Sequence, residues 1–323
     1  MVMLLHIRYA AAALAGLALT AAAPPLAAQD RAPVKVVASF SILGDIVKNV
    51  GGDRTDVTTL VGPDGDAHVF QPAPGDAKAL AAARVVFVNG LGFEGWMERL
   101  TQSADYKGAV VVATQGIQPQ TMDDDDKHDA HGHAHAKKES KATPERAAID
   151  PHAWQDLRRA QGYVDNILAG LIAADPAGET AYRANAAAYK QQLAALDAWA
   201  RGEIAQVPAA KRKVITSHDA FGYFATAYGV RFLAPVGIST DAEPSAKQVA
   251  TLIRQIRKEK TTALFVENIT NPKMIEQIAR ETGAKPGGRL YSDALAKPGQ
   301  PGATYIGMFR HNVTLLKAAM LGY

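Results

Sequence analysis

The chain has 323 residues, of which 48% are hydrophobic, so it is long enough to bury the cores of two lobes. Its formal net charge is only +3, and no stripe of Lys and Arg interleaved with aromatic residues is visible, which argues against nucleic-acid binding. The chain contains no cysteine, and this excludes a disulfide framework, a thiolate metal site and a lipid anchor attached to a cysteine.

Residues 1–28 are predicted to be a secretory signal peptide. Arg8 is the only charged residue before Asp30, the run Tyr9–Thr20 is apolar, and the Ala-rich stretch that ends at Leu26-Ala27-Ala28 supplies a cleavage site. A transmembrane anchor is the alternative, but the apolar run is short for about 30 Å of hydrocarbon. Without a cysteine to carry a lipid, we expect a periplasmic protein that is secreted, not lipidated and without a direct membrane anchor.

Residues 29–177 are predicted to form an N-terminal lobe in which short Val-rich runs alternate with helical patterns. Such alternation favours a parallel sheet that is buried on both faces. The predicted strands are Val34–Phe40, Asp56–Val61, Ala83–Asn89 and Ala109–Thr114, and the predicted helices are Ser41–Val50, Gly75–Ala82, Gly95–Ala104 and Asp156–Ala174. Residues 121–143 interrupt the pattern with a charged, low-complexity segment rich in His and Asp, for which we expect a disordered surface loop.

Residues 178–207 are predicted to form one long helix without an internal proline. Apolar residues recur in it at spacings of three and four, and about 30 residues would span roughly 45 Å. This length suits a rigid strut between two lobes.

Residues 208–323 repeat the alternation as a C-terminal lobe, with predicted strands Lys213–Ser217, Val230–Leu233, Ala263–Glu267 and Arg289–Ser292 and predicted helices Asp219–Tyr228, Ser245–Lys260, Pro272–Gly283 and Thr304–Leu321. The fold class is therefore α/β, with two lobes of parallel-rich sheet flanked by helices and joined by one long helix.

Three histidines, His68, His152 and His218, lie where a loop follows a predicted strand or opens a predicted helix. Ligands of open α/β sheets bind outside the carboxyl ends of the strands, so these imidazoles could converge on one metal. Asp293 follows the last strand and could complete a tetrahedron around zinc. Position alone leaves Glu267 as an equal rival, and each residue taken singly could be a cap or a hydrogen-bonded polar group.

Short motifs spread along the chain make the comparison more specific. They are Val37–Ile46, Val61-Gly62-Pro63 ahead of His68 and Gln71-Pro72, Asn89-Gly90 with Gly92 and Glu94 before Trp96, Asp150–Trp154, Ser217–Phe221, Phe265-Val266-Glu267 and Asp293–Leu295. With these motifs the chain resembles the zinc/manganese class of ABC-transporter solute-binding proteins, the ZnuA type, over essentially its whole mature length.

The resemblance implies two α/β lobes joined by one long helix and a metal held by His68, His152, His218 and Asp293. The third ligand is His in zinc-type members and typically Glu in manganese-type members. A loop rich in His and acidic residues often precedes the second ligand in the zinc type, which implies secondary metal capture by His128, His131, His133 and His135. The lipid-anchor cysteine of many relatives is missing here.

The expected function is capture of Zn²⁺, as the transported ligand rather than a catalytic cofactor, between the lobes and its delivery to an ABC-transporter permease. The chain is expected to be a monomer, with a periplasmic zinc chaperone as a further partner. A zinc hydrolase is the rival from another class, but catalytic zinc keeps a water position and no HExxH motif is present, so we expect no enzyme. A manganese receptor is the runner-up, although three histidines argue against it.

Overall fold

The structure is a computed structural model that describes residues 32–121, 148–261 and 263–322. The predicted signal peptide lies outside the described residues, as does the predicted loop 121–143 apart from Thr121. None of the helices in these described ranges is both long enough and apolar enough to cross a membrane.

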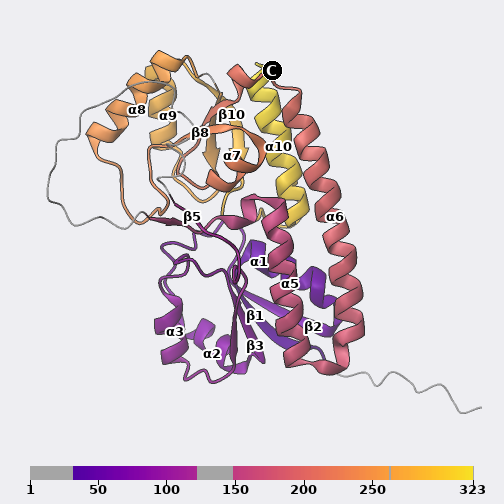
Figure 1. The fold of residues 1–323 in the computed structure, drawn as a ribbon. Coiled ribbons are helices and arrows are strands. Elements are labelled where there is room, and N and C mark those ends of the chain that lie inside the picture. The colour runs from indigo at the N-terminus through magenta and orange to yellow at the C-terminus, as the bar shows by residue number, and fades with distance from the viewer. Residues whose placement is uncertain (1–31, 122–147, 262, 323) are drawn as a thin grey trace, which may run out of the picture. The chain divides into compact units, whose positions relative to one another are not determined.

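The N-terminal lobe is built on a four-stranded parallel sheet with the order β2-β1-β3-β4. Its strands are β1 (Val34–Phe40), β2 (Thr55–Val61), β3 (Val85–Val88) and β4 (Ala109–Val112), and its first helices are α1 (Ser41–Gly51), α2 (Pro74–Ala82) and α3 (Met97–Ser103). Every residue of β3 is buried. Continuous burial of this kind requires a cover on both faces, as expected for parallel strands. Figure 1 shows α1 and α5 (Leu157–Ala174) to one side of the sheet and α2 and α3 to the other.

The C-terminal lobe contains a second four-stranded parallel sheet with the order β10-β9-β7-β8. The strands are β7 (Lys213–Ile215), β8 (Arg231–Leu233), β9 (Ala263–Glu267) and β10 (Lys285–Leu290), and the helices are α7 (Gly222–Tyr228), α8 (Ala246–Glu259), α9 (Lys273–Thr282) and α10 (Tyr305–Leu321). The side chains of β9 alternate between two cores. Leu264 packs with α8 and α9, whereas Phe265 belongs to the core that contains α10.

Helix α6 (Glu179–Ala205) runs alongside both lobes (Figure 1) and has 27 residues, which corresponds to about 40 Å. It packs against α1 and α5 of the N-terminal lobe and against α10 of the C-terminal lobe. The buried stripe that makes these contacts contains Tyr182, Ala186, Tyr189, Leu193, Leu196, Ala200 and Ile204. The fold is thus the predicted one, two α/β lobes with a long helix beside them.

Two predicted elements have a boundary that differs from the structure by more than two residues. The helix predicted from Asp219 begins only at Gly222, because His218 forms a parallel bridge with Val236 and Asp219 N donates to the carbonyl of Gly237. The last strand, predicted over Arg289–Ser292, is β10 at Lys285–Leu290. Its pairing with β9 shifts register between Pro286 and Arg289, where Gly288 has a φ of 116°. The pair Gly287-Gly288 is typical of a turn, so the sequence pattern did not indicate that the strand begins before it.

Candidate metal centre

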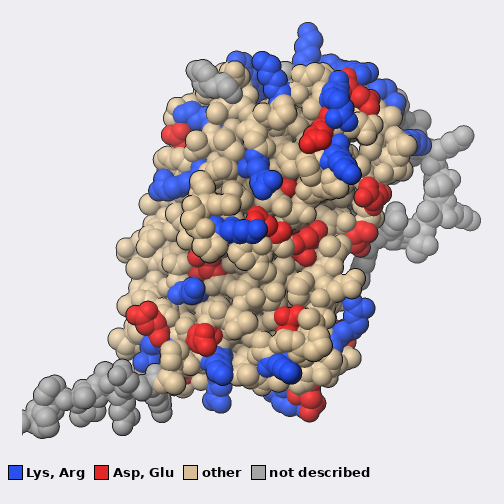
Figure 2. Space-filling view, turned by 180° about the vertical axis from the view of Figure 1, so that it is seen from behind, with Lys and Arg blue, Asp and Glu red and all other residues tan. Residues whose placement is uncertain are grey.

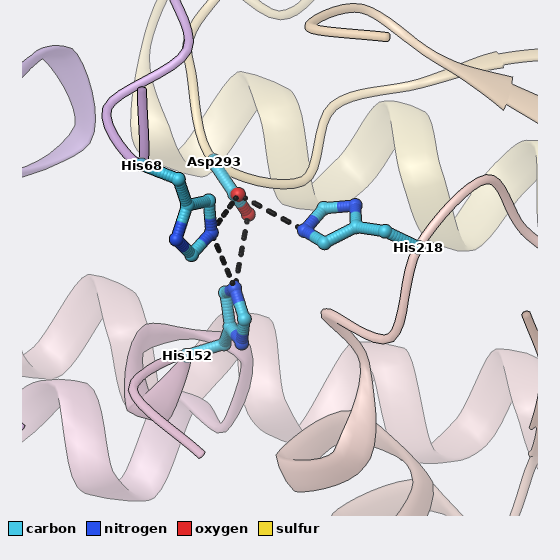
Figure 3. A group of neighbouring side chains, drawn as sticks. All are labelled: His68, His152, His218 and Asp293. Atoms are coloured by element: carbon cyan, nitrogen blue, oxygen red, sulfur yellow. Dashed lines mark hydrogen bonds and ion pairs between the residues drawn. The ribbon is translucent and has the colours of Figure 1, made fainter. Parts of the chain in front are cut away.

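The structure brings all four predicted ligands together between the two lobes (Figure 3). His68 lies in the loop after β2, and His152 follows the short strand β6 (Ile149–Asp150) and opens the 3-10 turn Ala153–Gln155. His218 follows β7 and Asp293 follows β10. One potential ligand atom from each of the four lies within 4.8 Å of those of the others. Each lobe therefore contributes two residues, from segments that follow strands, as the position of sites in α/β folds predicts.

The spacing of these atoms suits a small tetrahedral ion. Asp293 Oδ2 lies 3.1 Å from His68 Nε2 and 3.1 Å from His218 Nε2. The Nε2 atoms of His152 and His68 are 3.4 Å apart, and His152 Nε2 is 3.6 Å from Asp293 Oδ1. A tetrahedron with metal–ligand bonds of 2.0–2.1 Å has edges of about 3.3 Å. Four of the six ligand pairs already stand at close to that separation, and one ligand atom from each residue lies within 4.8 Å of those of the others.

The centre is closed off from solvent. The side chain of His68 is 4% exposed, and those of His152, His218 and Asp293 are 0% exposed. Aromatic rings form part of the wall, with Phe93 at 4.8 Å from the His68 ring and Trp154 at 5.2 Å from the His152 ring. Charges in such surroundings interact strongly because little water screens them.

The imidazoles of His152 and His218 each have a carboxylate close to Nδ1, the ring nitrogen that is not among the four donor atoms. Asp150 Oδ1 lies 2.7 Å from His152 Nδ1 and also accepts a hydrogen bond from the His152 backbone N–H. Glu267 Oε2 lies 2.5 Å from His218 Nδ1, while its Oε1 accepts the backbone N–H groups of Ser217 and His218. Contacts of this kind hold a metal-binding imidazole in one tautomer and orientation. Glu267, the positional rival of Asp293, thus lies behind His218 and not among the four donors.

The buried charges shift the pKa values of the centre. Burial opposes protonation of His152, but the carboxylates of Asp293 and Asp150 outweigh it and raise the pKa of His152 to about 9. Burial is likewise outweighed at His218, where Glu267 and Asp293 raise the pKa well above its ordinary value. Burial would raise the pKa of Asp293, yet the neighbouring His218 and His152 hold it well below its usual range.

The donor set fits a divalent cation. Asp293 Oδ1 is buried and has no hydrogen-bond partner among the residues that the structure describes. A buried carboxylate oxygen that accepts no hydrogen bond is costly, and a cation placed between the donors would satisfy it. Three neutral imidazoles and one carboxylate are ligands that zinc accepts.

Several supporting contacts were not predicted from the sequence. Trp154 Nε1 and Gln155 Nε2 both donate to the carbonyl of Ser292, which joins the segment after His152 to the residue before Asp293. Leu295 N donates to Ser41 Oγ. Trp154 belongs to the motif Asp150–Trp154, whereas Gln155 lies just outside it and carries no signal of this role in the sequence.

The described residues include one further histidine, His311, which is not among the four donors. His128, His131, His133 and His135 lie outside the residues that the structure describes. His311 lies in α10, where its Nε2 is 2.9 Å from the carbonyl of Arg289.

Known proteins resemble the chain over nearly its full length. The family profile described as "ZnuA: Zinc-uptake complex component A periplasmic" matches residues 36–319. The manganese-binding lipoprotein MntA of Bacillus subtilis (strain 168) is 35% identical over 295 residues, which cover 89% of this chain and 90% of that protein. The manganese ABC transporter substrate-binding lipoprotein PsaA of Streptococcus pneumoniae is 31% identical over 290 residues, which cover 87% of this chain and 86% of that protein.

A solved structure gives the same result. The periplasmic zinc binding protein TroA from Treponema pallidum superposes with a TM-score of 0.79 and 30% sequence identity, covering 90% of this chain and 99% of that one.

The expected localisation needs correction. We expected a periplasmic protein that is not lipidated, but relatives such as MntA and PsaA are named lipoproteins, a membrane-anchored class, and this contradicts the expectation. The inference relied on the absence of cysteine from the sequence. That absence removes the thiol to which a diacylglyceryl group would attach, but it does not determine where the protein resides, and the expectation is withdrawn.

The similar proteins are metal-binding, substrate-binding components of ABC transporters and not enzymes. This chain likewise binds a divalent metal as its cargo and works with a membrane permease and its ATPase. Because the matched family profile spans most of the chain, the protein belongs to the ZnuA family of metal-binding components of ABC transporters.

Proposed function

We propose that the protein captures Zn²⁺ with His68, His152, His218 and Asp293 and delivers it to its permease for high-affinity zinc uptake. The observation that carries the proposal is that four of the six ligand pairs are separated by 3.1 to 3.6 Å, close to the edge of a zinc tetrahedron. In this proposal the protein acts as a monomer, a zinc chaperone is a further partner, and residues 29–177 and 208–323 form the lobes that the helix 178–207 links.

Manganese is the second candidate, because MntA and PsaA are named for it. Manganese prefers more oxygen ligands and a higher coordination number than three imidazoles and one carboxylate provide. The test is metal analysis of the purified protein together with competitive titration of zinc against manganese. We expect one tightly held zinc per chain, and tighter binding of manganese than of zinc would contradict the proposal.

For the loop histidines His128, His131, His133 and His135 we propose a capture role, which is supported by composition alone. Four aspartates, Asp123 to Asp126, precede these histidines, and binding there must order the backbone at about 1–2 kcal/mol per residue, so several weak sites are expected. Deleting residues 122–140 should remove weak zinc equivalents in a titration while the tight site survives. Loss of the tight site in a folded deletion variant would assign primary ligands to the loop.

A further inference from the structure

The loop Val236–Pro244 of the C-terminal lobe contacts both lobes' ligand-bearing segments. Near its start, Val236 forms a parallel bridge with His218, and Asp219 N donates to the carbonyl of Gly237 at 3.3 Å. Further along, Thr240 Oγ1 donates to Asp66 Oδ2 at 2.6 Å. The loop thus extends from a ligand segment of its own lobe to the His68 loop of the other lobe.

Asp66 connects this loop to a metal ligand through a single carboxylate. While Oδ2 accepts the hydroxyl of Thr240, Oδ1 accepts the backbone N–H of His68 at 2.9 Å. Hydrogen bonds to an ionised carboxylate are among the stronger ones, and two of them restrict the carboxylate to one orientation. Displacement of Thr240 therefore removes one of the two bonds that fix Asp66, which lies two residues before His68 in the chain.

A cavity of about 760 Å³ lies against the same loop. Of the four predicted ligands, His68 alone lines it, together with Phe93 and Pro151 from the N-terminal lobe and Val236 and Glu243 from the loop. The four ligand side chains are at most 4% exposed. An ion that moves between the cavity and the centre must therefore pass His68, and His68 or the loop must shift to let it through.

Other contacts keep the base of the His68 loop in place when Thr240 moves. Asp64 N donates to the carbonyl of Leu295 at 2.9 Å, and Asn268 Nδ2 donates to Asp64 Oδ1 at 3.1 Å. These bonds join the lobes two residues before Asp66. Loss of the Thr240 bond would then free the end of the loop that carries His68 without separating the lobes.

We propose that Asp66 and Thr240 form a latch that controls how fast metal passes between this cavity and the four-ligand centre. Asp66 is a positioning residue that acts through His68, and the inference rests on the proposed function of the centre. Neither latch residue is one of the four donors. The latch therefore affects the rates of metal uptake and release more than the equilibrium affinity.

The test uses the full-length protein loaded with zinc and, in parallel, with manganese, and it measures metal release into excess chelator by stopped flow. Thr240→Val removes the hydroxyl at nearly constant volume and should speed release about tenfold, the order expected for one hydrogen bond to a carboxylate. Thr240→Ser keeps a hydroxyl and should release metal like the wild type. Ser239→Ala is the matched control, because the Ser239 hydroxyl accepts only from Asp241 N in the same loop among the described contacts.

A double-mutant cycle tests whether the effect runs through Asp66. Asp66→Ala should also release metal faster, and adding Thr240→Val to it should change the rate by less than twofold. Equal release by the Thr240→Val and Ser239→Ala variants would overturn the latch, as would full acceleration by Thr240→Val in the Asp66→Ala background. A wild-type protein that retains neither metal would instead overturn the proposed function, so the two failures are distinguishable.

Discussion

At the scale of single residues, His218 is held between two carboxylates. Its Nε2 lies 3.1 Å from Asp293 Oδ2, and its Nδ1 lies 2.5 Å from Glu267 Oε2. The side chains of all three are 0% exposed, so any change in their charges acts without much screening. Replacement of His218 therefore has to be considered together with Glu267.

We predict that His218→Glu combined with Glu267→Gln shifts preference from zinc towards manganese without abolishing metal binding. A carboxylate is the harder donor and can supply two oxygens, whereas the glutamine removes the facing negative charge. His218→Glu alone should bind both metals more weakly than the double variant, because a third buried carboxylate would repel its neighbours. Competitive titration of zinc against manganese checks both statements. Equal loss of both metals in a folded double variant would contradict the prediction.

The four candidate ligands also show how much of the site could be predicted from the sequence. The positions of His68, His152 and His218 after strands or ahead of a helix were enough to make them candidates, because parallel strands bring their carboxyl ends to one edge of a sheet. Position could not separate Asp293 from Glu267. Both lie beside His218, but Glu267 faces its Nδ1, whereas Asp293 faces its Nε2 and also lies beside His68 and His152. A one-dimensional pattern does not contain that information, and only the resemblance favoured Asp293.

At the scale of elements, Asp197 of α6 joins helices of both lobes. Its Oδ2 accepts from Arg158 Nε in α5 and from Arg201 Nε in α6, and its Oδ1 accepts from the hydroxyl of Tyr228 in α7. Burial would raise the pKa of Asp197, but hydrogen bonds from Arg201, Tyr228 and Arg158 lower it. The ionised carboxylate therefore stabilises the fold above its ordinary pKa, and that contribution is lost as the pH falls through the lowered value.

We predict that Asp197→Asn lowers the free energy of unfolding by about 2 kcal/mol at pH 7, because charge-assisted hydrogen bonds are lost while the two arginines keep their charge. Asp165→Asn is the matched control. Asp165 also pairs α5 with α6, through Lys190, but its side chain is 56% exposed, so its removal should cost less than about 1 kcal/mol. Urea denaturation of both variants measures the difference. Equal unfolding midpoints for the two would contradict the proposed role of Asp197.

Elements were more predictable than the contacts between them. The boundaries of α6 and β1 follow from local patterns of apolar residues, and α8 follows from the Ser245 cap, which accepts from Gln248 N. The predicted start of α7 was wrong, because His218 forms an isolated bridge with Val236, which lies 18 residues further along the chain. The bond between Asp66 and Thr240 joins residues 174 positions apart, and no local pattern contains it.

At the scale of the whole molecule, the net charge is small although the formal charges of the two lobes have opposite signs. Residues 208–323 contain 16 Lys and Arg against 8 Asp and Glu, whereas residues 33–121 and 148–177 contain 9 against 13. In the view of Figure 2, Lys and Arg gather most densely towards the top, where the C-terminal lobe lies. The total of +3 excluded a uniformly basic surface but gave no indication of this separation. The candidate metal centre lies between the lobes, where Asp150 of the N-terminal lobe and Asp293 of the C-terminal lobe both lie beside His152.

We predict that zinc binding at pH 7 releases roughly two protons, from His152 and His218. Without metal, the pKa of His152 is about 9 and that of His218 is raised well above its ordinary value, so both imidazoles are protonated at pH 7. Zinc needs the lone pair of a neutral imidazole, so protons compete with the metal, and the apparent affinity should rise with pH up to about 9.

Proton binding by these histidines stabilises the metal-free fold below their ordinary pKa of about 6.5, and this stabilisation is lost as the pH rises through 9. The rise in melting temperature on adding zinc should therefore grow between pH 6 and pH 8. Calorimetric titration in buffers of different ionisation enthalpy counts the released protons, and a binding enthalpy that is the same in every buffer would contradict the prediction.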